Sequence, residues 1–106
     1  MVINMRSKVY EAPIDKIFEA CKHAIYRCKF TINEENKDKG IIIASTHPTI
    51  FSWGEEIIIK IETISGMETK VTVESYPKAQ LFDWGKSRDN ENKIMKYLDD
   101  ILEEDI

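Results

Sequence analysis

Apolar and polar residues alternate over several short segments of this sequence. The alternation covers residues 2–10, 30–33, 57–62 and 70–74. It is typical of β-strands, because successive side chains of a strand point to opposite faces of the sheet. Residues 41–46, which begin with the apolar run 41–44, also have the length of a strand. The pattern therefore predicts five strands.

Two further segments have a helical period. In the first, the apolar positions follow one another at steps of three and four residues, which gives a helix one continuous apolar face. These positions are Ile14, Ile17, Phe18, Cys21, Ile25 and Cys28. A second helix is expected near the C-terminal end, with Ser87 or Asp89 as its N-cap. Its expected buried residues are Ile94, Leu98, Ile101 and Leu102.

The order of these elements predicts a fold class. We expect residues 1–106 to form one α+β domain of the order β-α-β-β-β-β-α, with a five-stranded antiparallel sheet and both helices on one face. The last four strands are joined by short or medium links and should pair as a meander. The first strand is then expected to pair with the fifth. A hydrophobic content of 42% and a charged content of 32% are ordinary for a globular protein.

The facing of the third strand is ambiguous, because three isoleucines follow one another there. We expect Ile42 and Ala44 to face the helices, since a small residue suits a position where a helix crosses a sheet. In that case Ile41, Ile43 and Ile58 lie on the outer face of the sheet. An apolar patch there would be a candidate interface with another protein or a second copy of the chain.

Two tetrapeptides share a Trp-Gly core. Ser52-Trp53-Gly54-Glu55 precedes the fourth strand, and Asp83-Trp84-Gly85-Lys86 precedes the last helix. With the order of elements, they make residues 5–102 resemble a reduced helix-grip fold, the fold of START-like and pollen-allergen-like lipid binders and of BamC-type lipoprotein domains. The chain is also similar to a group of short prokaryotic domains with paired W-G motifs. We expect no outer-membrane role, because neither a secretion signal nor a lipid-anchor cysteine is found.

The resemblance implies a ligand groove between the sheet and the helices. In this interpretation both tryptophan rings line one end of the groove, and charged residues form its rim. The candidate groove residues are Trp53, Gly54, Glu55, Asp83, Trp84, Gly85 and Lys86. In the alternative interpretation the two rings close the ends of a small core, with their indole N–H groups bonded to the backbone.

No residue pattern indicates catalysis, a metal site or a cofactor. On a helix, Cys21 and Cys28 lie about 10 Å apart, too far for a disulfide, so we expect two buried free thiols. His23 points away from their face, and His47 has no partner at zinc-ligand spacing. The sequence has no glycine-rich phosphate loop. We therefore expect a protein that is not an enzyme.

The charge and the apolar runs limit the partners. A net charge of −4 gives no attraction to a nucleic acid. The apolar runs are far shorter than the ~20 residues of a membrane-spanning helix, so we expect no membrane partner and a cytoplasmic location. A homo-oligomer, another protein or a small apolar ligand are the expected partners.

Two functions remain open. The first is a non-enzymatic interaction or assembly module that uses the outer sheet face or the acidic last helix. The second is a module that binds a small apolar or amphipathic ligand near Trp53 and Trp84. We slightly prefer the first, because a core of about 100 residues needs most of its apolar side chains for stability.

Overall fold

The chain alternates one strand, one helix, four strands and a second helix. The computed structural model describes residues 4–47, 54–77 and 86–104. Its elements are β1 (Asn4–Tyr10), α1 (Ile14–Arg27), β2 (Thr31–Asn36), β3 (Ile41–Ser45), β4 (Glu55–Ser65), β5 (Glu68–Pro77) and α2 (Lys86–Glu104). Helix α2 begins at Lys86, so Ser87 and Asp89 lie inside the helix and neither is the N-cap that the sequence predicted.

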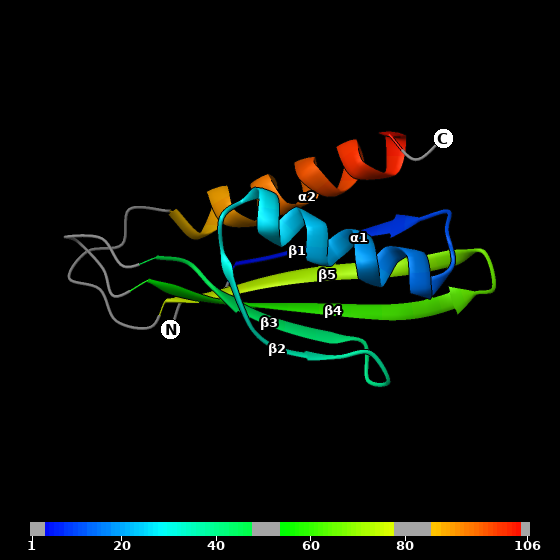
Figure 1. The fold of residues 1–106 in the computed structure, drawn as a ribbon, viewed down its shortest axis with the longest axis horizontal. Helices are drawn as coiled ribbons and strands as arrows, with labels where there is room; N and C mark the ends of the chain where they lie inside the picture. Colours follow the sequence, from blue (N-terminus) through cyan, green and yellow to red (C-terminus); the bar gives the residue numbers. More distant parts are fainter. Residues whose placement is uncertain (1–3, 48–53, 78–85, 105–106) are drawn as a thin grey trace.

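The five strands form one antiparallel sheet in the order β1-β5-β4-β3-β2. Strands β2 to β5 are neighbours in sequence and in space, as predicted for a meander. Strand β1 pairs with β5, so α1 has to cross the sheet to reach β2 at the far edge (Figure 1). The predicted fold class and the pairing of the first strand with the fifth are both confirmed.

Both helices lie on the same face of the sheet and run side by side in opposite directions (Figure 1). The two helices contact each other, and on the sheet α1 contacts β4, β2 and β5, whereas α2 contacts β5 and β1. The first residues of α2 and of β4 and the last residues of β5 lie at the same end of the molecule, on the left in Figure 1. This end is called the α2-start end below.

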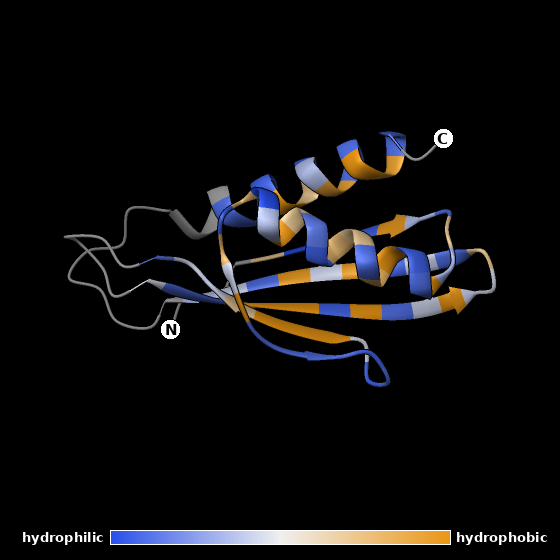
Figure 2. Cartoon of the chain, viewed as in Figure 1, coloured by the Kyte–Doolittle hydropathy of each residue, from blue (hydrophilic) through white to orange (hydrophobic). Residues whose placement is uncertain are grey.

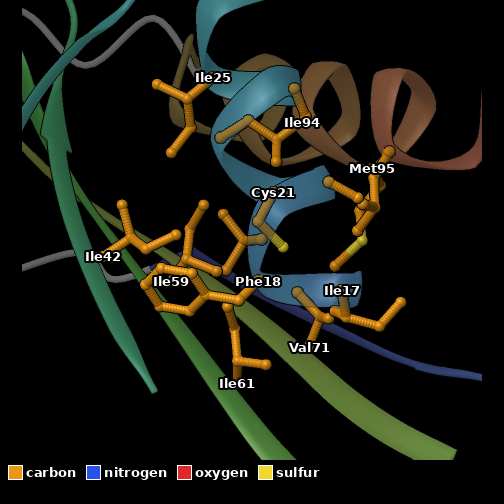
Figure 3. Close-up of a cluster of buried hydrophobic side chains, with 14 of the residues drawn as sticks. Ile17, Phe18, Cys21, Ile25, Ile42, Ile59, Ile61, Val71, Ile94 and Met95 are labelled. Atoms are coloured by element: carbon orange, nitrogen blue, oxygen red, sulfur yellow. The ribbon is translucent and has the colours of Figure 1, made fainter. Parts of the chain in front are cut away.

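The core lies between the helices and the sheet. Hydrophobic and hydrophilic residues alternate along β4 and β5 (Figure 2), and the inward residues are fully or almost fully buried. They include Ile57, Ile59, Ile61, Val71 and Val73. In Figure 3, Phe18 and Cys21 of α1 and Ile94 of α2 are part of the same cluster. Burial of each such isoleucine stabilises the fold by about 1.5–3 kcal/mol.

The ambiguous strand β3 faces as predicted. Ile42 and Ala44 are fully buried against the helices. Ile41 and Ile43 are half-buried on the outer face. In the antiparallel register Ile43 pairs with Ile58, so the three predicted outer isoleucines are neighbours.

Strand β1 differs from the central strands, because two of its helix-facing residues, Arg6 and Lys8, are charged. Arg6 and Lys8 reach α2, where they donate hydrogen bonds to Asn92 and Asp99. Met5 and Val9 lie on the other side of the strand and are exposed. An edge strand can accept this arrangement, because long basic side chains cover apolar surface while their charged ends stay in water.

Candidate functional site

Among the residues that the structure describes, four buried polar side chains lie between the sheet and α2 at the α2-start end, where a small core would normally have apolar residues. The four come from three elements: Glu55 of β4, Ser75 of β5, and Asn90 and Glu91 of α2. Their exposed fractions are 6%, 0%, 8% and 2%, in that order. We call these four residues the polar cluster.

Glu55 is held in place by the end of β3. Its backbone N–H donates a 2.8 Å hydrogen bond to Thr46 Oγ1, and its carbonyl accepts a 3.0 Å bond from the Thr46 N–H. The preceding Gly54 has a φ of 96°, a conformation that favours glycine. A Cβ atom at Gly54 would lie 2.8 Å from the Thr46 carbonyl oxygen. The glycine of the first Trp-Gly motif is therefore needed for the close approach that fixes Glu55.

The other three members continue the two apolar surfaces that form the core. Ser75 follows Val73 on the inward side of β5 and pairs with Ile57 of β4. Asn90 lies one turn before Ile94 on α2, on the same face of the helix. Glu91 precedes Met95 in the same way. The polar cluster is thus the end of the core, where polar residues replace apolar ones.

Three atoms of the polar cluster have no hydrogen-bond partner among the described residues. They are Ser75 Oγ, Asn90 Nδ2 and Glu91 Oε1. A buried polar group without a partner costs about 1–3 kcal/mol of stability. Native proteins keep few such groups, so three of them at one end of the core make this end a candidate binding site.

Within the polar cluster, the carboxyl of Glu91 has a shifted pKa. Burial raises its pKa above the ordinary value, and the nearby Glu55 carboxylate adds to this rise. The Ser75 hydroxyl opposes the shift without making a hydrogen bond of ordinary geometry. Arg6 also opposes it, but its effect is the smallest, and its guanidinium donates to Asn92.

Only some of the predicted groove residues are among the residues that the structure describes. Gly54 and Glu55 are described, and Glu55 is a buried member of the polar cluster. Lys86 is the first residue of α2. The remaining four predicted residues lie outside the described residues; they are Trp53, Asp83, Trp84 and Gly85.

Sequence reasoning missed Ser75, Asn90 and Glu91. A usable signal was present for each of them. Extending the apolar stripe of α2 by one turn toward its start leads from Ile94 to Asn90 and Glu91. Extending the inward positions of β5 beyond Val73 leads to Ser75. In both cases a polar residue continues a pattern that is otherwise buried.

The described residues also form two open grooves elsewhere on the surface. One, of about 340 Å³, lies between β1 and the end of α2 and includes Lys8 and Asp99. The other, of about 360 Å³, lies between the two helices and includes His23 and Arg27. Their many charged side chains do not suit an apolar ligand, and neither groove contains a member of the polar cluster.

The two cysteines are buried free thiols, as predicted. Burial raises the pKa of Cys21 to about 12 and that of Cys28 to about 11. Both therefore stay protonated near neutral pH and are poor nucleophiles.

His23 is exposed, and within residues 4–47, 54–77 and 86–104 no group of acidic, His or Cys side chains is placed to hold a metal ion.

Comparisons with known proteins give a likeness of fold and no family. No family model and no curated protein matches the sequence. Among solved structures, the chain is similar to the crystal structure of Ara h 8.0201, with 14% sequence identity and a TM-score of 0.49. The match covers 95% of this chain and 97% of that chain. At this level the likeness concerns the path of the backbone and assigns no role to any residue.

The described helices were also compared with what a bilayer requires. Neither α1 nor α2, over the residues described, combines the length and apolar character that a membrane crossing needs.

Proposed function

We propose that this chain is a non-enzymatic module that binds a small amphipathic molecule at the polar cluster. The observation that carries the proposal is the set of three buried atoms without a hydrogen-bond partner among the described residues: Ser75 Oγ, Asn90 Nδ2 and Glu91 Oε1. The set offers both donors and acceptors. A ligand that reaches it would therefore carry a polar head group.

The surroundings of the polar cluster favour an amphipathic ligand over a fully polar one. Ser75 has Val73 and Ile57 as its neighbours on the inward face of the sheet, and both are fully buried. Ile94 and Met95 lie one turn further along α2 and are also buried. Ligand sites in proteins commonly combine such apolar walls with a few convergent polar groups.

A comparison of two buried hydroxyls tests whether the polar cluster serves stability or binding. Ser75 and Thr69 are both fully buried on the inward side of β5. Thr69 Oγ1 donates a 2.7 Å hydrogen bond to the Ala12 carbonyl, whereas Ser75 Oγ has no partner. We expect Thr69→Val to lose about 1–2 kcal/mol of unfolding free energy, because it orphans that carbonyl. Ser75→Ala should be neutral or stabilising, as measured by urea denaturation.

Binding itself is tested on the purified chain of residues 1–106. We expect native mass spectrometry to show a co-purified small molecule, or a thermal-shift screen of amphipathic compounds to find one that raises the melting temperature. The double variant Ser75→Ala/Asn90→Leu should fold and lose that ligand, because two of the three free polar atoms are removed. A wild type that binds nothing in either assay contradicts the proposal, as does a double variant that binds unchanged.

A second candidate function is an interface on the outer sheet face. Ile43 and Ile58 pair directly across β3 and β4, and Ile41 lies two residues away on the same face. Beside them, Lys60 and Glu74 form a 2.9 Å ion pair. An apolar centre with a polar rim is the usual composition of a protein interface.

The interface is tested by changing Ile58. We expect Ile58→Lys to keep the fold, because the side chain is half-buried on the outer face. If the face mediates self-association, the wild type is a dimer and the variant a monomer in sedimentation equilibrium, with circular dichroism as the folding control. A wild type that stays monomeric at high concentration contradicts self-association through this face.

A further inference from the structure

Glu91 of the polar cluster is a buried acidic group that lies near a second one, Glu55. Burial raises the pKa of the Glu91 carboxyl, and the charge of Glu55 adds to this rise. Arg6 acts on Glu91 in the opposite sense, but more weakly than any other group that affects it. Arg6 is exposed, and its guanidinium also donates a hydrogen bond to Asn92. Among the described residues, the opposing positive charge is therefore weak and lies toward solvent.

The free atoms next to these charges include two that can accept a hydrogen bond. Glu91 Oε1 is an acceptor whenever the carboxyl is ionised, and Ser75 Oγ can accept as well as donate. Both side chains are more than nine-tenths buried. A group that donates to both atoms and carries a positive charge would satisfy the hydrogen bonds and stabilise the ionised Glu91 carboxyl at the same time.

We infer that the buried head group of the ligand is a protonated amine. This inference rests on the function proposed above and adds the chemical class of the ligand. The ammonium donates to Glu91 Oε1 and Ser75 Oγ, while its charge stabilises the ionised carboxyl of Glu91. A carboxylate head group would repel the Glu91 carboxylate, and a neutral hydroxyl would bring no positive charge to it.

Three probes that share a six-carbon chain distinguish an amine, a hydroxyl and a carboxylate head group. They are hexylamine, hexanol and hexanoate. Their binding to the purified chain of residues 1–106 is measured by isothermal titration calorimetry and by thermal shift at neutral pH. We expect hexylamine to bind most tightly. Glu91→Gln should weaken hexylamine binding by about tenfold or more, because a hydrogen bond to a charged group is lost. The matched control is Glu62→Gln, which removes one charge from an exposed position of β4 and should leave binding unchanged.

Three outcomes would overturn the amine head group, and separate measurements judge the proposed binding function. Tighter binding of hexanol or hexanoate than of hexylamine overturns the amine and leaves the proposed binding function intact. Equal loss of hexylamine binding in Glu91→Gln and Glu62→Gln shows a general attraction to an acidic protein and also overturns the inference. No binding of any probe overturns it as well, whereas the Ser75→Ala and Thr69→Val comparison and native mass spectrometry judge the binding function independently.

Discussion

The hydroxyl of Tyr10 donates a 2.9 Å hydrogen bond to the carboxylate of Asp99 and so joins the edge strand β1 to α2. Lys8 lies 3.0 Å from the same carboxylate and adds an ion pair. Burial and then the Asp99 carboxylate raise the pKa of the Tyr10 phenol above its ordinary value. The phenol therefore stays protonated and remains a donor throughout the physiological range.

Removing this hydroxyl should weaken the attachment of α2 to the sheet. We expect Tyr10→Phe to lose about 1–2 kcal/mol of unfolding free energy, because a hydrogen bond to a charged group is lost. Urea denaturation measures the change. The control is Tyr26→Phe, since Tyr26 is 58% exposed and should tolerate the same substitution. Equal stability of the two variants would show that the bond to Asp99 contributes little.

The turn between β2 and β3 depends on a glycine. Gly40 has a φ of 66°, and a Cβ atom there would lie 2.2 Å from the Ile61 carbonyl oxygen. We expect Gly40→Ala to lose more than the ~1–2 kcal/mol that the left-handed conformation alone costs. Gly66→Ala is the matched control, because nothing lies within 4 Å of a Cβ at that turn position. Similar melting temperatures for both variants would contradict this account.

The raised pKa of Glu91 gives a pH dependence of stability with a definite sign. The folded state holds the proton more tightly than the unfolded chain does, so stability falls as pH rises between the ordinary carboxyl value and the raised one. We expect Glu91→Gln to be more stable than the wild type at neutral pH, with an advantage that shrinks as the pH is lowered. Thermal unfolding from pH 4 to 8 would measure this, over a window set by the ordinary carboxyl pKa of about 4.3.

Glu74 provides the opposite control. The Tyr76 hydroxyl and Lys60 donate hydrogen bonds to its carboxylate and lower its pKa. Its contribution to stability is therefore present at neutral pH and is lost as the pH falls through the lowered value. Glu74→Gln should be less stable than the wild type at neutral pH. If Glu91→Gln and Glu74→Gln shift stability in the same direction at neutral pH, this contradicts the statement that Glu91 is buried in the polar cluster.

The two cysteines should react slowly with a thiol reagent in the native protein. Their raised pKa values, about 12 for Cys21 and about 11 for Cys28, leave almost no thiolate near neutral pH. Cys21 is fully buried and Cys28 is 8% exposed, so Cys28 should react first. Denaturant should make both react at once, as followed by a chromogenic disulfide reagent. Rapid labelling of both thiols in the folded protein would contradict the orientation of α1.

The sequence by itself determined the elements of this fold and the facing of its central strands. The period of the apolar residues in α1 placed Cys21 and Ile25 in the core, and the alternation in β4 placed Ile57 inward and Ile58 outward. Even the three consecutive isoleucines of β3 could be oriented, because Ala44 suits a crossing helix. These features follow from local geometry, since the side-chain period of an element depends on that element alone.

Only the tertiary structure decided which polar residues meet. Ser75 belongs to β5 and Glu91 to α2. Whether the two residues lie near each other depends on how α2 packs on β5. For the same reason the sequence could not show that Arg6 and Lys8 of an edge strand reach Asn92 and Asp99. A buried polar residue interrupts a periodic pattern in the same way as a solvent-exposed one. Its burial becomes visible only when the packing of distant elements excludes water from it.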